Sequence, residues 1–225
     1  MTQVAEILEW LRRHGSQRNI DGMARYGIVS RHPVMGVSVG DLQRYAKTIG
    51  RDHALALALW RTKIYEARML CAWIDDPERV TSAQMDRWAR DFDNWAICDT
   101  MVMHCFDRSP FAWAKVRAWS TSKDEFVKRA AFALVASMAV HHKQSSDATF
   151  RPAFKLIARA ATDDRNFVKK AVNWALRAVG RRSPALRTEA IALANVLAAR
   201  DEPSARWIGK DALRDFARVA ARKKK

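Results

Sequence analysis

Two segments of this 225-residue chain carry nearly the same residue pattern at a separation of 41 positions. Asp124-Glu-Phe-Val-Lys-Arg-Ala-Ala-Phe-Ala-Leu134 corresponds to Arg165-Asn-Phe-Val-Lys-Lys-Ala-Val-Asn-Trp-Ala175. A fainter copy begins at Tyr65 and keeps an aromatic residue three positions before Arg68. An internal repeat of this length is typical of two-helix units that stack on one another and bury a continuous core.

The hydrophobic pattern predicts helices along almost the whole chain. Apolar residues recur with helical period, connections are short and polar, and the chain has only 8 Gly and 6 Pro residues. The predicted fold is therefore all-α: a HEAT- or armadillo-like helical repeat solenoid that forms a single curved domain over residues 1–225. We expect a capping helix within residues 1–20 and further helices at 52–60, 64–74, 94–106, 110–119, 124–140, 147–161, 164–179, 184–199 and 205–221.

Short polar motifs predict where several helices begin and end. Ser38 and Thr81 have side chains that can accept hydrogen bonds from the first turn of a following helix. Asp75-Asp76-Pro77 predicts the end of the helix before it, because the residue before a proline disfavours helical geometry. Asp21-Gly22 is expected to lie between two helical segments.

Positive charge is concentrated in the second part of the chain. The net charge is +16, of which the first 100 residues contribute +1 and the remainder +15. A polyanion is the simplest partner for such a surface, because each neutralised phosphate releases counterions; exposed charge that only aids solubility is the alternative. Lys128 and Arg129 of one repeat and Lys169 and Lys170 of the next are expected at equivalent places, where they would form a basic stripe.

Several functional classes lack support in the sequence. No apolar run approaches 18 residues and the N-terminus has no signal-peptide pattern, so no membrane contact is expected. Cys71, Cys98 and Cys105 have no Cys-x-x-Cys spacing and are expected to be reduced thiols buried in helices. His104-Cys105 and His141-His142 lack spaced partners, so no metal site is predicted. No glycine-rich phosphate loop or hydrolase nucleophile motif occurs.

The most informative polar pair is Trp95 and Asp99, which are four residues apart and would share one face of a helix. Trp174 lies on a repeat helix beside Arg177. One interpretation is a core tryptophan with an exposed aspartate beside it. The other is a site where indoles stack on a nucleotide sugar and arginines bind phosphate. A carboxylate there can stabilise an oxocarbenium-like sugar and orient a water molecule, as in glycosidic cleavage. The remaining tryptophans expected in core or groove-filling positions are Trp10, Trp60, Trp73, Trp88, Trp113 and Trp207.

Taken in order, five motifs resemble the DNA alkylation repair enzymes of the AlkD-type glycosylase family. They are Met23-Ala-Arg-Tyr26, Gly36-Val37, Trp95-x-x-x-Asp99, Phe-Val-Lys-Arg129-Ala and Phe-Val-Lys-Lys-Ala-Val-Asn-Trp174-Ala-Leu-Arg177. The resemblance extends over nearly the whole chain. It implies HEAT-like repeats that curve around DNA and an enzyme of base excision repair that removes 3-methyladenine and 7-methylguanine.

The resemblance also implies roles for individual residues. Asp99 would be the catalytic carboxylate, and Trp95 and Trp174 would hold the deoxyribose of the damaged nucleotide. Arg129 would bind the adjacent phosphate. DNA contacts are expected from Tyr26, Lys128, Lys169, Lys170 and Arg177.

The implied reaction is monofunctional hydrolysis of the N-glycosidic bond without flipping of the base. The expected partner is double-stranded DNA containing alkylated bases, bound by a cytoplasmic, nucleoid-associated monomer with no metal or organic cofactor. Two positions depart from the family pattern. Many relatives have an acidic residue where this chain has Ala96, and some have a longer polar side chain where it has Ser38.

Two other functions remain open. The first is a non-catalytic HEAT-repeat protein that binds DNA or RNA structures, which predicts no lesion-dependent chemistry. The second is a protein-binding scaffold, which predicts no salt-sensitive affinity for duplex DNA. The terminal Arg222-Lys-Lys-Lys225 could contact a flanking phosphate or remain a solvated tail.

Overall fold

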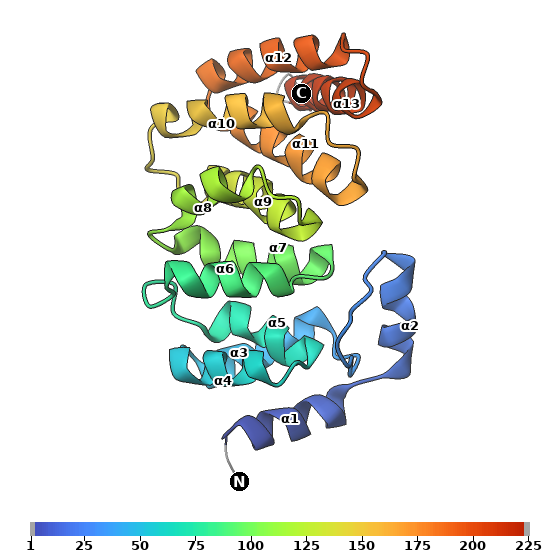
Figure 1. Cartoon of the computed structure of the whole chain (residues 1–225), viewed down its shortest axis with the longest axis vertical. Coiled ribbons are helices and arrows are strands. Elements are labelled where there is room, and N and C mark those ends of the chain that lie inside the picture. Colours follow the sequence, from blue (N-terminus) through green and yellow to red (C-terminus); the bar gives the residue numbers. More distant parts are fainter. Residues whose placement is uncertain (1–2, 223–225) are drawn as a thin grey trace. The chain divides into compact units, whose positions relative to one another are not determined.

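The computed structural model describes residues 3–222, and every regular element in that range is a helix (Figure 1). The predicted all-α class is thereby confirmed. The chain folds as two compact units, Met1–Phe111 (unit 1) and Ala112–Lys225 (unit 2). The prediction of a single domain over the whole chain stays a prediction.

Unit 1 is organised around a central buried helix, α5 (Tyr65–Ile74), which packs against α3 (Val39–Ile49), α4 (His53–Arg61) and α7 (Trp95–His104). Nine of the ten residues of α5 are buried, so this helix has partners on nearly all sides. The other elements of the unit are α1 (Gln3–His14), α2 (Gln17–Arg25), α6 (Ser82–Asp91) and the 3-10 helix η1 (Phe106–Arg108).

The predicted helix ends in unit 1 are confirmed. Ser38 Oγ accepts the backbone N–H of Asp41 at 3.1 Å at the start of α3. Thr81 Oγ1 does the same for Gln84 at 3.1 Å at the start of α6. Helix α5 ends at Ile74, and Asp75 follows as its C-cap. These caps satisfy backbone groups that a helix end would otherwise leave unpaired.

The prediction for Asp21-Gly22 is wrong, because both residues lie inside α2. The expected single capping helix is instead two helices, broken at Gly15 and Ser16, where Ser16 is the N-cap of α2. A Cβ on Gly15 would lie 2.0 Å from the carbonyl oxygen of Met35, so only glycine fits this close approach. Helix α2 tolerates its own glycine because no residue of α2 is buried, and Figure 1 shows it set apart from α3 to α7.

Unit 2 is built on the two repeated segments. They form α9 (Glu125–His141) and α11 (Asn166–Gly180), which pack directly against each other (Figure 1). Phe126 and Phe167 meet at the starts of these helices, with ring centroids 5.4 Å apart. The repeat therefore predicts the pairing of α9 with α11. The remaining helices are α8 (Ala112–Trp119), α10 (Asp147–Ala160), α12 (Pro184–Ala198) and α13 (Pro203–Arg222).

The three cysteines are buried and form no disulfide with a described residue. Cys71 lies in α5 and Cys98 in α7 as predicted, whereas Cys105 follows the end of α7. Burial raises the pKa of the Cys71 and Cys105 thiols, which disfavours a nucleophilic role.

No described helix is long and apolar enough to cross a membrane. Within residues 3–222, no group of three or more His, Cys, Asp or Glu side chains is placed to hold a metal ion. The last three lysines of the chain lie outside the described residues.

Candidate functional site

Helix α7 presents Trp95 and Asp99, one turn apart, in its first half. The start of the helix is fixed by Asn94, which is 1% exposed and whose Oδ1 accepts the backbone N–H of Ile97 at 3.2 Å. Trp95 is thus the first helical residue, and Asp99 lies one turn later, both partly exposed. Ile97 and Val102 are buried. Trp95 and Asp99 therefore share one face of α7, as their spacing predicts, and Ile97 lies on the opposite side, but Val102, three residues after Asp99, is buried on the same face as the pair.

The indole of Trp95 is held in one orientation by the segment after α2. Its Nε1 donates a hydrogen bond to the backbone carbonyl of Tyr26 at 2.9 Å. Tyr26 is 72% exposed, so its ring remains accessible to a ligand. Trp95, which the resemblance places against the deoxyribose, and Tyr26, which it places in contact with DNA, are therefore joined in unit 1.

A pocket of about 610 Å³ lies in the same unit and is lined by α2, by the segment that follows it, and by parts of α3, α5 and α7. Ser38 and Ala96, the two positions that depart from the family pattern, both line it. Tyr26 lines it as well. Ser38, Ala96 and Tyr26 therefore line one pocket of unit 1.

Two carboxylates that the sequence reasoning missed hold this segment in place. Glu66, 1% exposed in α5, accepts the backbone N–H groups of Met35 at 2.9 Å and Gly36 at 2.7 Å. Asp93 accepts the Ser30 hydroxyl at 3.1 Å. The signal available in the sequence for Glu66 was a charged residue in the mostly apolar segment 64–74, because a buried charge requires partners.

In unit 2, one face of α11 carries Lys170, Trp174, Arg177 and Arg181 at helical spacing. Trp174, Arg177 and Arg181, together with Arg182, line a hollow of about 390 Å³ against α9. Lys170 is exposed, and Trp174 and Arg177 are half-buried. The sequence reasoning missed Arg181 and Arg182, although the four-residue step from Arg177 would have indicated Arg181.

Two aspartates of α13 hold most of these arginines. Asp215 is 4% exposed and lies 2.6 Å from Arg181 Nη2 and 3.7 Å from Arg177 Nη1. Asp211 lies 3.8 Å from Arg177 Nη1. Burial alone would raise the pKa of Asp215, but the hydrogen bonds from Arg181 and Arg218 and the charges of Arg181 and Arg177 together lower it. Asp215 therefore stays ionised at neutral pH, and the two aspartates fix the guanidinium groups and offset part of their charge.

The predicted basic stripe is wrong for Lys128 and Arg129. Lys128 Nζ lies 2.8 Å from the carboxylate of Asp163. Arg129 is 7% exposed, and its Nη1 donates to the backbone carbonyl of Phe167 at 2.8 Å. These cations join α9 to the start of α11, because the neighbouring repeat supplies a carboxylate and a carbonyl that the sequence pattern does not reveal.

The second pair of the stripe is more accessible. Lys170 is exposed, whereas Lys169 is half-buried with its Nζ 5.2 Å from the ring centroid of Trp207. The accessible positive charge of α11 therefore lies at Lys170 and towards Arg181 rather than on a four-residue stripe.

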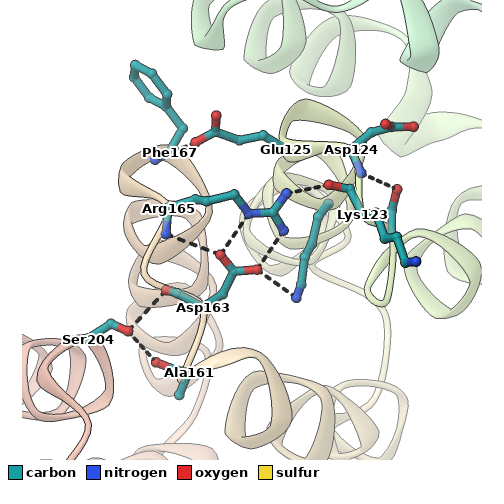
Figure 2. Close-up of polar contacts among 10 residues, drawn as sticks. Lys123, Asp124, Glu125, Ala161, Asp163, Arg165, Phe167 and Ser204 are labelled. Atoms are coloured by element: carbon teal, nitrogen blue, oxygen red, sulfur yellow. Dashed lines mark hydrogen bonds and ion pairs between the residues drawn. The ribbon is translucent and has the colours of Figure 1, made fainter.

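Asp163 is the centre of the polar cluster drawn in Figure 2. Arg165 donates to it from Nε at 2.9 Å and from Nη2 at 2.6 Å. The backbone carbonyl of Asp163 accepts the Ser204 hydroxyl at 3.0 Å, and Lys128 completes the ion pairs. The hydrogen bonds from Arg165 and Lys128 hold the pKa of this carboxyl well below its ordinary value, although burial opposes them.

This shift predicts a loss of stability in acid. As the pH falls through the ordinary carboxyl pKa of 3.8, the unfolded chain binds a proton at Asp163 while the folded chain does not. The free energy of unfolding should therefore decrease below about pH 4. Urea titrations between neutral pH and pH 3 should show a smaller decrease for Asp163→Asn than for the wild type. Equal decreases would show that Asp163 is not a source of the acid sensitivity.

Comparison with known proteins gives a family and a fold. The family model of the DNA alkylation repair enzyme matches residues 7–216. No curated protein matches the chain. Among solved structures, the chain is similar to a protein from "a new family of proteins related to the HEAT-like repeat DNA glycosylases with affinity for branched DNA structures". The TM-score is 0.76, with 20% sequence identity over 95% of each chain.

At this identity, the structural similarity concerns the fold, and it confirms the predicted HEAT-like helical repeats. The family match extends through both units and includes Trp95, Asp99, Arg129 and Trp174. The chain belongs to the DNA alkylation repair enzyme family.

Proposed function

We propose that the protein is a monofunctional DNA glycosylase that hydrolyses the N-glycosidic bond of cationic alkylated purines such as 3-methyladenine and 7-methylguanine. The observation that carries this proposal is the Trp95/Asp99 pair on one accessible face of α7, in a chain of the DNA alkylation repair family. An indole and a carboxylate one helical turn apart can contact the same deoxyribose.

The proposed chemistry depends mainly on electrostatic stabilisation. A purine alkylated at N3 or N7 is positively charged and leaves as a neutral base with the electrons of the glycosidic bond. No general acid is then required, and the base can remain stacked in the duplex. Positive charge develops on the sugar, where the Asp99 carboxylate stabilises it, orients the water molecule that attacks C1′ and accepts the proton that this water loses. The face of the Trp95 indole adds a cation–π contribution.

Unit 2 contributes the groups proposed to hold the DNA. Trp174 offers a second indole, and Arg177 beside it offers a phosphate contact. Lys170 is exposed and suited to a further phosphate. The resemblance assigns another phosphate to Arg129, whose orientation is fixed by its hydrogen bond to the carbonyl of Phe167. Contacts from Lys128 and Lys169 are also proposed, and they would require these side chains to exchange their present partners.

The direct test is incubation of the purified protein with DNA that contains 7-methylguanine or 3-methyladenine. We expect free methylated base to accumulate, with none released from unmodified DNA of the same sequence. The proposed substrate is double-stranded DNA at the nucleoid, acted on by a monomer, so one molecule per lesion should suffice in single-turnover conditions. A folded protein that binds this DNA and releases neither base would exclude the proposal.

The second candidate is a non-catalytic protein that binds DNA structures. It is favoured by the solved structure of similar fold, whose description includes affinity for branched DNA. This alternative predicts that a branched junction is bound more tightly than a linear duplex and that no base is released from methylated DNA. It also predicts that Asp99→Asn leaves binding to the junction unchanged.

A further inference from the structure

Trp207 lies on the surface of unit 2, at the beginning of α13. The sequence predicts a core or groove-filling position for it; the core is excluded, because 36% of the residue is exposed. Trp207 lines a shallow hollow of about 380 Å³ together with Pro203, Arg206 and Lys210. These four residues follow at steps of three, one and three, so they share one face of the helix. A large aromatic ring is therefore left accessible between two cations.

A third cation adjoins the ring from the neighbouring helix. The Nζ atom of Lys169 in α11 lies 5.2 Å from the centroid of the Trp207 ring. We name Lys169, Arg206, Trp207 and Lys210 the Trp207 patch. Its residues come from α11 and α13.

The cations of the Trp207 patch differ from those farther along α13. There, Arg214 and Arg218 form ion pairs with Asp211 and Asp215, at 3.1 and 3.0 Å. Within residues 3–222, by contrast, no carboxylate forms an ion pair with Lys169, Arg206 or Lys210. Arg206 donates to the backbone carbonyl of Asp201, which leaves its charge uncompensated. The unmatched charge of the patch is therefore suited to an anionic partner.

We propose that the Trp207 patch binds an unpaired nucleotide of DNA, with its base stacked on the exposed indole and its phosphates bound by Lys210 and Arg206. Stacking on aromatic side chains beside a positively charged track is how proteins hold single strands without reading their sequence. This inference rests on the proposed action on DNA, and it adds a contact for strands that lack a complement, such as ends, gaps and branches. A protein partner would need acidic groups for the cations and a surface that packs on the indole. The experiment below distinguishes such a partner from DNA.

The experiment compares two labelled DNA probes by fluorescence anisotropy: a blunt duplex, and the same duplex with a single-stranded extension. Wild-type protein is expected to bind the extended probe more tightly. Trp207→Ala should lower affinity for the extended probe by about tenfold, equivalent to about 1.4 kcal/mol, and leave the blunt probe unaffected. Trp207→Phe should retain most of the preference, because a ring remains available for stacking.

Charge is tested separately. Lys210→Ala should reduce the slope of log affinity against log salt by about one for the extended probe. Lys155→Ala, which removes an exposed lysine of α10, is the matched control and should leave the preference for the extended probe intact. Thermal unfolding of each variant checks that it is folded.

Equal binding of the two probes by wild type, or a preference that survives Trp207→Ala, would overturn the proposal. The second outcome would favour a protein partner for the patch. Base release from methylated blunt duplex should be unchanged in Trp207→Ala. If wild type releases no base but its preference for the extended probe depends on Trp207, the glycosylase proposal fails and the Trp207 patch stands.

Discussion

Replacement of Asp99 by asparagine is expected to slow the release of 7-methylguanine by about 100- to 1,000-fold, which corresponds to about 3–4 kcal/mol of transition-state stabilisation. The amide has nearly the same shape as the carboxylate but carries no negative charge. It can therefore neither stabilise the positive charge on the sugar nor orient the attacking water as strongly. Single-turnover rates with methylated duplex DNA measure the effect.

Affinity for the methylated duplex should change little in the same variant, because the proposed phosphate contacts come from cations of unit 2 and not from Asp99. Glu78→Gln is the matched control, since it also removes one negative charge from an exposed position of unit 1. It should react at the wild-type rate. An unchanged rate in Asp99→Asn, or an equal decrease in both variants, would contradict a chemical role for Asp99.

The second large effect is expected for Gly36→Ala. Gly36 has a φ of +79°, and a Cβ there would lie 2.2 Å from the carbonyl oxygen of Ser16 and 2.8 Å from Cγ1 of Ile20. Its backbone also donates to Glu66 and accepts from the Ser16 N–H. The backbone strain of alanine at this φ and the displacement of Ser16 and Ile20 should together lower the free energy of unfolding by at least about 2 kcal/mol. This corresponds to a decrease of about 4–8 °C in the melting temperature.

Gly22→Ala is the matched control for this prediction. Gly22 lies inside α2 with no atom within 4 Å of an added Cβ, so alanine should raise helix stability by up to about 1 kcal/mol. Gly36→Ala should also slow base release, because the segment it displaces supplies the Tyr26 carbonyl that holds Trp95. Equal melting temperatures for the two variants would show that the close approach at Gly36 is not a constraint.

The parts of the fold that depend on local pattern could be predicted from the sequence. The repeat indicated the pairing of α9 and α11, because equivalent residues such as Phe126 and Phe167 stand at the same place in successive units and meet there. Ser38 and Thr81 indicated helix starts, because an N-cap acts within three residues of itself. The four-residue spacing of Trp95 and Asp99 likewise placed them on one face of a helix.

The parts that depend on distant partners could not be predicted. Lys128 is bound by Asp163 and Arg129 by the carbonyl of Phe167, residues that are 35 and 38 positions away. From the repeat alone, Lys128 and Arg129 were expected at the same places in their helix as Lys169 and Lys170 in theirs. The break at Gly15 likewise follows from the approach of Met35, a backbone contact that residue type does not reveal.

The proposed chemistry is tested most directly by product analysis of a single-turnover reaction on duplex DNA containing one 7-methylguanine. Wild type and Asp99→Asn are compared at equal concentration. We predict that wild type yields equal amounts of free 7-methylguanine and abasic site, on a strand that breaks only after alkali treatment, while Asp99→Asn yields almost none. Release of base at the same rate by both proteins, or by neither although both bind the DNA, would contradict the assignment of glycosidic hydrolysis to Asp99.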